Sequence, residues 1–384
     1  MISVEILRGA AALEAIPEEW ERLVGDSFTA AFSNPGWHLA WLDAFPQQSI
    51  AVVTARDEGR LVGILPLARF RTDARGLYFT EVAPLARGDY QPPIVSPEYA
   101  ATALPAMLDA AFAHFGRRGV FWWPNIPVTD PSLPVLREYF QAHKMPFVED
   151  REVAPRLRLN GCDFATAEKM WSSSHRIDVR RQRKRLAEKG PVSLWQPKTY
   201  AEADAALTEF FQVHDEKWLA QGLPGKFQNP TEQKHFRAIF KRLWGRGLLF
   251  STVRCGDVDV SYGVAFFAGG WPQWYRPSYR KEYHNFSPSK IHIALLVEEA
   301  CRLQWQGIDF LLGEEPYKNL WSNEKMEVVS IHAGFSEWAP SYFWFTRGKP
   351  YVKQRLVLYY MRAQAWWQRR KMPKGSRTGE GKAT

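Results

Sequence analysis

The sequence predicts an α/β fold of the mixed, α+β type that occurs twice along the chain. The first observation is a repeated order of elements: a strand hairpin, a helix, a glycine and a short apolar strand. The second is a helical period of apolar residues from Ile291 to Trp305, followed by an apolar segment. The third is the length of 384 residues, because single hydrophobic cores stop growing at about 250 to 300 residues.

The expected elements fall into two series of similar order. The first comprises helices at 17–24 and 37–45, strands at 50–55 and 61–70 around a Glu58-Gly59 turn, a helix at 104–115 and a strand at 120–123. The second comprises helices at 176–189 and 201–220, strands at 248–254 and 258–268 around a Cys255-Gly256 turn, a helix at 288–305 and a strand at 308–312. We therefore expect an N-terminal domain at 1–160, a C-terminal domain at 161–345, and a ligand cleft between them.

The net charge of +9 belongs to the end of the chain. Residues 346–384 contain eleven Lys or Arg against one Glu, so this segment is at +10 and the remainder is at −1. Within 350–372, apolar residues that include Trp366 and Trp367 share one helical face, with arginines beside it. This pattern favours a basic amphipathic helix that contacts an anionic membrane, or else one that packs on its own domain. A polar, disordered tail is expected after it.

Several other classes of protein are disfavoured. Three widely separated cysteines indicate neither a disulfide framework nor a zinc site, and no histidine has metal-ligand spacing. There is no G-x-S-x-G or Walker motif, no signal peptide and no run long enough to span a membrane. We expect a cytoplasmic protein without a permanently bound cofactor or metal. The basic C-terminal segment adds the expectation that the protein contacts the inner face of the membrane peripherally.

The segment from Trp274 to Trp321 concentrates the chemistry. Pro288 begins a helix that Ser287 is expected to cap, and Gly307 is expected to end it in a left-handed conformation. Asp309 lies within the following apolar strand. The sequence Gly-Glu-Glu-Pro-Tyr-Lys comes directly after that strand, at the end where α/β sheets usually hold their sites.

These motifs resemble a known family. F-S-P-S-K and G-I-D-F-L-L-G-E-E-P-Y-K-N-L-W are similar to the C-terminal signature of CelD-type acetyltransferases, a branch of the GNAT superfamily that is related to Fem-type aminoacyl transferases. The arginine-rich helix S-S-S-H-R-I-D-V-R-R-Q-R-K-R-L, F-S-N-P-G-W-H-L-A-W and G-D-Y-Q-P-P extend the resemblance over residues 20–335. It implies two tandem GNAT-like domains, acyl-CoA as acyl donor and an amine as acceptor.

Two helices are candidates for binding the phosphates of the donor. The first turn of the helix at 288, comprising Ser287, Pro288, Ser289 and Lys290, offers free N–H groups and a cation. Arg176 and Arg180 begin a basic helix face that suits a coenzyme A phosphate or anionic lipid headgroups. Each has a plainer interpretation: an ordinary capped core helix for the first and a solvated face for the second.

For proton transfer, Glu314 is the preferred general base, assisted by Asp309, with Tyr317 or Tyr275 as an acid or orienting hydroxyl. Asp309 is equally well explained as a structural hydrogen-bond acceptor, and Tyr317 as part of the wall. Substrate contacts are expected from the following residues: Tyr275, Glu315, Lys318, Trp321, His38, Asp89 and Tyr90.

The resulting hypothesis is an acyl-CoA-dependent N-acyltransferase that acts on an amphiphilic amine at a membrane surface. A narrower form of this hypothesis is that the amine is a sphingoid-base-like lipid, similar to the substrate of bacterial ceramide synthases. Three alternatives remain open: an exopolysaccharide amino-sugar N-acetyltransferase, a Fem-type transferase that uses aminoacyl-tRNA, and an inactive GNAT-like scaffold. DNA is not expected as a partner, because the globular part is nearly neutral.

Overall fold

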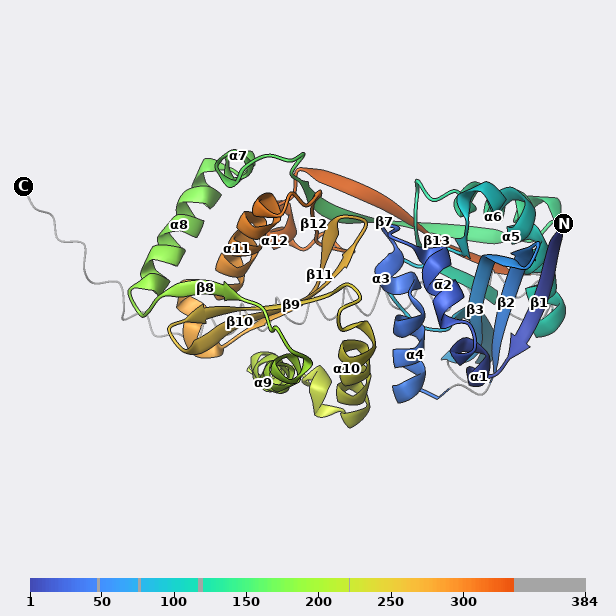
Figure 1. The fold of residues 1–384 in the computed structure, drawn as a ribbon, viewed down its shortest axis with the longest axis horizontal. Helices are drawn as coiled ribbons and strands as arrows, with labels where there is room; N and C mark the ends of the chain where they lie inside the picture. The colour runs from blue at the N-terminus through green and yellow to red at the C-terminus, as the bar shows by residue number, and fades with distance from the viewer. Residues whose placement is uncertain (47–48, 75–76, 117–119, 221, 335–384) are drawn as a thin grey trace, which may run out of the picture.

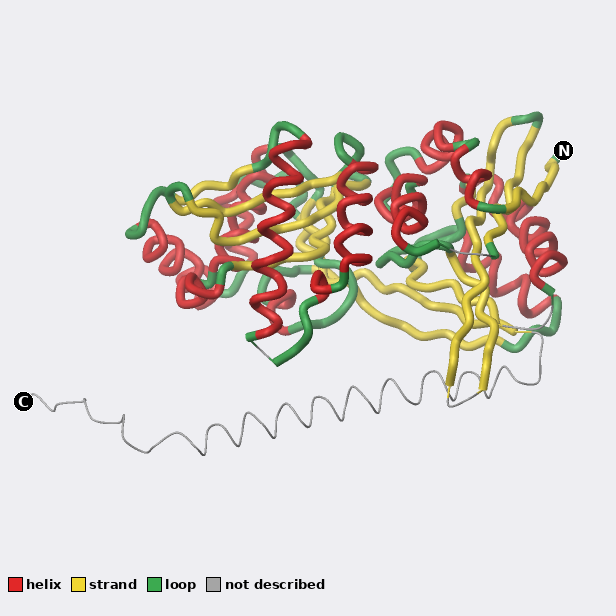
Figure 2. Tube along the Cα trace, turned by 90° about the horizontal axis from the view of Figure 1, so that it is seen from below, coloured by secondary structure: helices red, strands yellow, loops and turns green. Residues whose placement is uncertain are grey.

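The computed structural model describes residues 1–46, 49–74, 77–116, 120–220 and 222–334. Helices and strands alternate along the chain and build one large mixed sheet covered by helices, so the predicted α/β class is confirmed (Figure 1). The strands run through both halves of an elongated molecule (Figure 2). The predicted helix at 350–372 lies outside the described residues.

The elements of the first half are β1 (Ile2–Arg8), α1 (Ala10–Glu14), α2 (Pro17–Val24), α3 (Ala30–Ser33), α4 (Pro35–Ala44), β2 (Ile50–Asp57), β3 (Arg60–Ala74), β4 (Leu77–Pro84), β5 (Ile94–Val95), α5 (Ala100–Phe115), β6 (Val120–Pro127), α6 (Ser132–Ala142) and β7 (Phe147–Arg158). Those of the second half are α7 (Phe164–Ala167), α8 (Ser173–Ala187), β8 (Val192–Trp195), α9 (Tyr200–Leu219), α10 (Pro230–Leu243), β9 (Leu248–Cys255), β10 (Val258–Ala268), β11 (Trp271–Tyr279), α11 (Pro288–Arg302), β12 (Gly307–Asp309), α12 (Pro316–Asn319) and β13 (Glu324–Gly334).

The two halves share one strand arrangement. In the first, β1, β2, β3 and β4 pair antiparallel in sequence order, and β6 joins β4 in parallel after the crossover helix α5. In the second, β8, β9, β10 and β11 pair in the same way, and β12 joins β11 in parallel after α11. The repeated element order expected from the sequence is therefore present as a repeated topology.

The halves exchange their last strands. The order across the middle of the sheet is β6-β13-β7-β12. β7, from the first half, therefore pairs with β12 and β13 of the second, and β13 pairs with β6 of the first. The predicted boundary at residue 160 falls directly after β7. The domain limits stay a prediction, but the strands that pair with β7 both lie beyond that limit.

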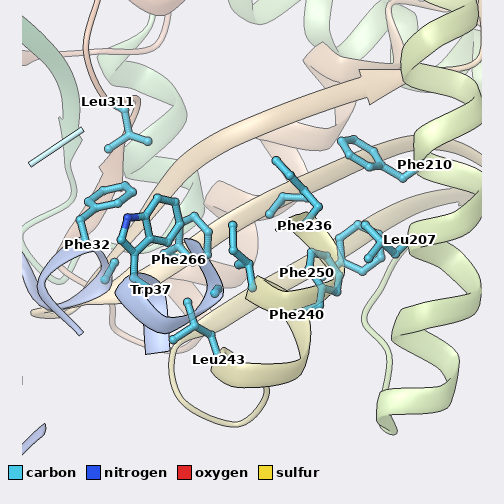
Figure 3. Packing of buried hydrophobic residues seen from close by; sticks show 14 of the residues in the cluster. Phe32, Trp37, Leu207, Phe210, Phe236, Phe240, Leu243, Phe250, Phe266 and Leu311 are labelled. Carbon is cyan, nitrogen blue, oxygen red and sulfur yellow. The ribbon is translucent and has the colours of Figure 1, made fainter. Parts of the chain in front are cut away.

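A shared core also joins the halves. Phe32 and Trp37 of the first half pack edge-on against Phe266 of the second, with ring centroids 5.8 and 5.4 Å apart (Figure 3). Nearby, the Arg242 guanidinium of α10 forms two hydrogen bonds of 2.6 and 2.9 Å with the Asp43 carboxylate of α4. Aromatic burial and this ion pair fix α10 against α4 across the middle of the molecule.

Gly307 does not end a helix, which corrects the sequence interpretation. α11 ends at Arg302, and the left-handed residue after it is Gln304, with φ 55°. Gly307 instead belongs to β12, where a Cβ atom would lie 1.9 Å from the Leu157 carbonyl oxygen of β7. The glycine is needed because two backbones approach closely, not because a helix stops.

Candidate active site

The candidate site lies where β11 and β12 part. Their ladder consists of one pair, Gln273 with Asp309, and β11 then continues to Tyr279 without β12 beside it. A cavity of about 300 Å³ lies next to this parting. It is lined by Lys217, Trp274, Pro277, Tyr279, His284, Ser287, Pro288, Ser289, Lys290, Ile293, Tyr317, Leu320 and Trp321. We call it the β11–α11 pocket.

The first turn of α11, which the sequence suggests as a donor-binding site, faces this pocket. Ser287, Pro288, Ser289 and Lys290 are all in the lining. The Ser287 side chain does not cap the helix, contrary to prediction: the residue is left-handed, with φ 51°, and makes no side-chain capping bond. Its carbonyl accepts from the N–H groups of Lys290 and Ile291 at 2.9 and 3.3 Å. Ser289 therefore contributes the N–H that is left for a ligand.

The two lysines of the pocket differ in their surroundings. Lys290 forms an ion pair with Asp178 of α8, and the same carboxylate also bonds to Arg181. Lys217, at the end of α9, lies with its ammonium 4.8 Å from the centroid of the Tyr279 ring. No carboxylate of the described residues is within ion-pair distance of it, and burial lowers its pKa. The sequence had no signal for Lys217, because its place depends on how α9 packs beside β11.

Aromatic rings form most of the remaining wall. Trp321 is buried and packs edge-on against Trp171, with ring centroids 4.7 Å apart. Tyr317 is 38% exposed, and burial of its hydroxyl raises its pKa well above the usual value, so the phenol stays protonated at neutral pH. Tyr317 and Trp321 were both predicted as site residues, and the structure brings them together with Ser287 and Lys290 in one pocket.

A β-bulge occurs at the parting point. Val264 pairs with Arg276 and Ala265 pairs with Trp274, so Tyr275 has no partner on β10. Bulges redirect backbone groups and are common beside active sites. The Tyr275 ring does not line the pocket. It packs on the other side of the sheet, 5.3 Å from the Phe266 ring.

Asp309 is buried at the same point and is connected to the first half. The Tyr90 hydroxyl donates to it, 3.0 Å from each carboxylate oxygen, and the Leu311 N–H donates at 2.6 Å. Arg156 Nε lies 3.6 Å from its second oxygen. Burial raises the pKa of Asp309 to about 6, against the opposing effects of Arg156 and these hydrogen bonds. Both oxygens of Asp309 are thus engaged within the protein, as a structural hydrogen-bond acceptor would be.

Asp89 is a second carboxylate with a raised pKa. Burial raises it to about 6; Lys318 opposes the shift, Asp309 adds to it, and Arg276 opposes it. Lys318 and Arg276 are chain neighbours of the pocket residues Tyr317 and Pro277, whereas Asp89 itself is outside the pocket lining. Among the described residues it has no ion pair within 4.0 Å. The carboxylate is therefore chemically available.

Glu314, the preferred base of the sequence analysis, is placed elsewhere. Its side chain is 54% exposed and pairs with Lys325, and it is outside the pocket lining. Glu315 is similarly exposed and pairs with Lys318 at 2.8 Å. Both glutamates point toward solvent, because the chain turns outward after Gly313, whose φ is 102°. The role of Glu314 as a base rests on the sequence alone.

Lys318 is buried and holds the loop after β12. Its ammonium donates to the carbonyl oxygens of Leu311 and Leu312. Leu311 adopts a left-handed conformation, with φ 57°, that a branched side chain rarely takes. Lys318 thereby fixes the loop that presents Tyr317 to the pocket.

Three other predicted residues lie away from the pocket. Arg180 forms an ion pair with Glu168, 2.8 Å from one carboxylate oxygen, and Arg176 donates to the Glu168 carbonyl at 3.3 Å. His38 is buried in α4, where burial lowers its pKa to about 3. The two arginines are thus engaged within the protein, and His38 is a neutral core residue.

The chain shows neither a clustered metal site nor a membrane span within its described parts. No three residues among His, Cys, Asp and Glu come together there in a way that would hold a metal ion. None of the described helices combines the length and apolarity that crossing a bilayer requires.

Comparison with known proteins identifies the region around the pocket. Residues 173–319 match the acetyltransferase (GNAT) domain model. FemX aligns with 85% of this chain and 96% of its own, at a TM-score of 0.59 and 11% identity. The C-terminal domain of a putative lysylphosphatidylglycerol synthetase from Agrobacterium fabrum aligns with 86% of this chain and 95% of its own, at a TM-score of 0.53 and 10% identity. No curated protein sequence matches the chain significantly. The segment that matches the GNAT-type acetyltransferase domain therefore includes most of the β11–α11 pocket.

Proposed function

We propose that this chain is an N-acyltransferase that moves an acyl group from a pantetheine thioester, expected as acyl-CoA, to the amine of an amphiphilic acceptor. The observation that carries this proposal is the parting of β11 and β12 beside a pocket headed by the first turn of α11. Parting parallel strands leave backbone groups free, and a helix N-terminus attracts phosphate. The match of residues 173–319 to the GNAT domain supports the same assignment.

The chemistry is attack of the amine nitrogen on the thioester carbonyl. A C–N bond forms, the C–S bond breaks, one proton leaves the nitrogen and one is delivered to the departing sulfur. We assign Asp89 as proton acceptor. It is outside the pocket lining, but its half-buried carboxylate, with a pKa of about 6, is ionised and still basic at neutral pH. Tyr317, which stays protonated, is the proton donor.

Backbone N–H groups beside the Tyr275 bulge are suited to polarising the carbonyl. They lie on β11 beyond its last pair with β12. Such preorganised donors commonly give the largest single contribution to acyl-transfer catalysis. Asp309 is a positioning residue in this scheme, because it acts through Tyr90 and the Leu311 N–H and has no exposed surface of its own.

The aromatic and aliphatic pocket lining favours an amphiphilic ligand. Trp274, Tyr279, Leu320 and Trp321 offer apolar surface, and no Asp or Glu of the described residues is in the lining. A sphingoid-base-like amine combines an apolar chain with a reactive nitrogen and suits such a wall. An amino-sugar acceptor, which the CelD resemblance implies equally, is the competing substrate.

The decisive experiment is product analysis with purified protein. Palmitoyl and acetyl thioesters of coenzyme A are each offered to a sphingoid base and to glucosamine, and products are identified by mass. An N-acylated sphingoid base as product supports the lipid acceptor. N-acetylglucosamine as product would instead identify an amino sugar as the acceptor. Absence of any amide product with these and other primary amines, including in the presence of aminoacyl-tRNA, would leave the inactive scaffold as the remaining assignment.

A further inference from the structure

The charge on the β11–α11 pocket is unusually small for a ligand as anionic as coenzyme A. The ionisable residues of its lining, apart from tyrosines, are Lys217, His284 and Lys290. Lys290 pairs with Asp178, a carboxylate that it shares with Arg181, and Lys217 is the lysine of the pocket without a carboxylate partner among the described residues. Lys217 is half-buried, with its ammonium over the Tyr279 ring and no carboxylate at ion-pair distance among the described residues, so its charge is available to an anionic ligand group.

A single lysine without a carboxylate partner suits a ligand that brings a single phosphate group into the pocket. Coenzyme A has three phosphates, whereas a pantetheine arm attached to a serine of a carrier protein has a single phosphodiester. Charge-assisted bonds from Lys217 and from the Ser289 N–H would satisfy that phosphodiester. The pocket has no further free lysine or arginine for the remaining phosphates of coenzyme A.

A basic helix face lies beside the pocket. α8 carries six Lys or Arg and a single Asp. It contacts the pocket wall on two sides: Asp178 pairs with Lys290, and the His175 ring lies 4.5 Å from the Trp321 ring. Arg180, Arg181 and Lys184 follow Ile177 at intervals of three, four and seven residues, so they share one face of the helix.

This face has the character of a protein-docking surface. Ile177 is 65% exposed, and the side chains of Arg180 and Arg181 are 68% and 64% exposed, although each is also ion-paired, with Glu168 and Asp178 respectively. Lys184 is also exposed and has no ion pair among the described residues. An exposed apolar residue next to exposed cations suits an acidic helical partner, since complementary charge steers association and the apolar contact adds affinity.

We propose that the preferred acyl donor is the phosphopantetheine thioester of an acidic acyl carrier protein, which docks on the α8 face and inserts its arm into the β11–α11 pocket. Free acyl-CoA is a weaker donor of the same acyl group. This inference rests on the proposed acyltransferase function. The transfer step is unchanged, except that the sulfur leaves as the thiol of the carrier's own arm.

The test compares two donors and four variants. Palmitoyl and acetyl groups are supplied on a holo acyl carrier protein or on coenzyme A, and kcat and KM are measured with an accepted amine. Arg180→Gln/Lys184→Gln weakens the α8 face without touching the Asp178 carboxylate that pairs with Lys290, and Lys184→Glu repeats the test at a residue without an ion pair among the described residues. Lys217→Met alters the phosphate contact. Lys234→Glu/Lys241→Glu, on α10, is the matched surface control.

We expect a lower KM for the carrier thioester than for the coenzyme A thioester. Both α8 variants should raise the carrier KM about tenfold and leave the coenzyme A KM within about twofold, as expected of a docking surface that touches one donor. Lys217→Met should raise both, and the α10 control neither. Equal or better use of coenzyme A, with carrier kinetics insensitive to the α8 variants, would overturn the inference while the acyltransferase function stood.

A binding measurement keeps the two proposals separable. Holo and apo forms of the carrier protein are titrated against wild type and the Lys184→Glu variant by calorimetry. Tighter binding of the holo form that depends on Lys184 supports docking even if no amide product is found, in which case the proposed function fails alone. Absence of carrier binding rejects the docking directly.

Discussion

The Tyr90 hydroxyl lies 3.0 Å from both oxygens of the Asp309 carboxylate, and this contact ties a loop of the first half to the point where β11 and β12 part. Asp309 has no exposed surface, and its pKa is about 6. A change in either residue is therefore expected to alter the stability of the connection between the halves before it alters the chemistry.

Because of Asp309, the free energy of unfolding is predicted to decrease as the pH rises from about 4 to 6. Its pKa in the folded state, about 6, is above the unfolded value near 4, so the folded protein favours the protonated acid. The stabilisation is complete below the unfolded pKa and is lost as the pH rises through the folded pKa, by about 2 to 3 kcal/mol. Urea unfolding of wild type and Asp309→Asn at several pH values measures this. A difference between the two proteins that does not vary with pH would contradict the assigned shift.

Tyr90→Phe removes the donor and leaves the buried carboxylate with fewer partners. We expect a loss of about 1 to 3 kcal/mol in the free energy of unfolding, since the carboxylate keeps its desolvation cost. Tyr99→Phe is the matched control, because Tyr99 donates to the Asp57 carboxylate at 3.1 Å in a much more exposed setting. Equal small losses for the two variants would show that the Tyr90 contact contributes little.

Asp89→Asn is expected to lower kcat by about 10² to 10⁴ with little change in KM for the thioester, because it removes the proposed proton acceptor. Wild type should lose activity as the pH falls through about 6, where Asp89 becomes protonated. The variant should lose that limb of its pH profile. Glu314→Gln is the informative comparison, since Glu314 is exposed and outside the pocket. If Glu314→Gln shows the large loss and Asp89→Asn does not, the base is Glu314.

Lys318→Met is expected to raise the KM for the thioester by loosening the loop that presents Tyr317. The substitution keeps the aliphatic stem but removes the bonds to the carbonyls of Leu311 and Leu312. Without them the left-handed Leu311 is held less firmly, and we expect a cost of about 1 to 3 kcal/mol in unfolding free energy. Lys325→Met, which removes an exposed pair with Glu314, should change neither quantity measurably. Identical kinetics for the two variants would refute the positioning role of Lys318.

Gly307→Ala should destabilise the protein severely, by about 3 kcal/mol or more, because no rotamer change can relieve a Cβ placed 1.9 Å from a backbone oxygen. Gly59→Ala is the comparison. It has open space around it but a φ of 84°, so it should cost about 1 to 2 kcal/mol from backbone conformation alone. Chemical denaturation distinguishes the two costs, and similar values would mean that β7 shifts to accommodate the methyl group.

Elements with strong local signals were predicted well. α2 occupies the predicted residues 17–24 and β10 the predicted residues 258–268, and Glu58 and Gly59 both have positive φ in the turn expected there. Proline at a helix start, glycine in a turn and an apolar run are decided by neighbours in the chain. The repeated topology followed from their order.

The pairing of β7 with β12 and β13 was not predicted, because strands far apart in sequence leave no local trace of their partners. The same limit decides which residues of the candidate site could be predicted: those close together in sequence could be, and those brought together by packing could not. Ser287 to Lys290, Tyr317 and Trp321 were grouped correctly, since they flank one helix and one loop. Lys217 and Arg276 were missed because their neighbours come from packing. Glu314 was favoured because it lies just beyond the end of the strand, and sequence position does not show which way a side chain faces.

The strand exchange has a consequence for biosynthesis. When residues 1–160 have emerged from the ribosome, β6 and β7 are present but β13, the strand that lies between them, is not. β13 ends at residue 334 and is synthesised much later. Until it emerges, the edges of β6 and β7 remain open to pairing with other chains. Maturation of the first half must therefore wait for nearly the whole polypeptide, and a gene split after residue 160 would yield two fragments that acquire their native form only in each other's presence.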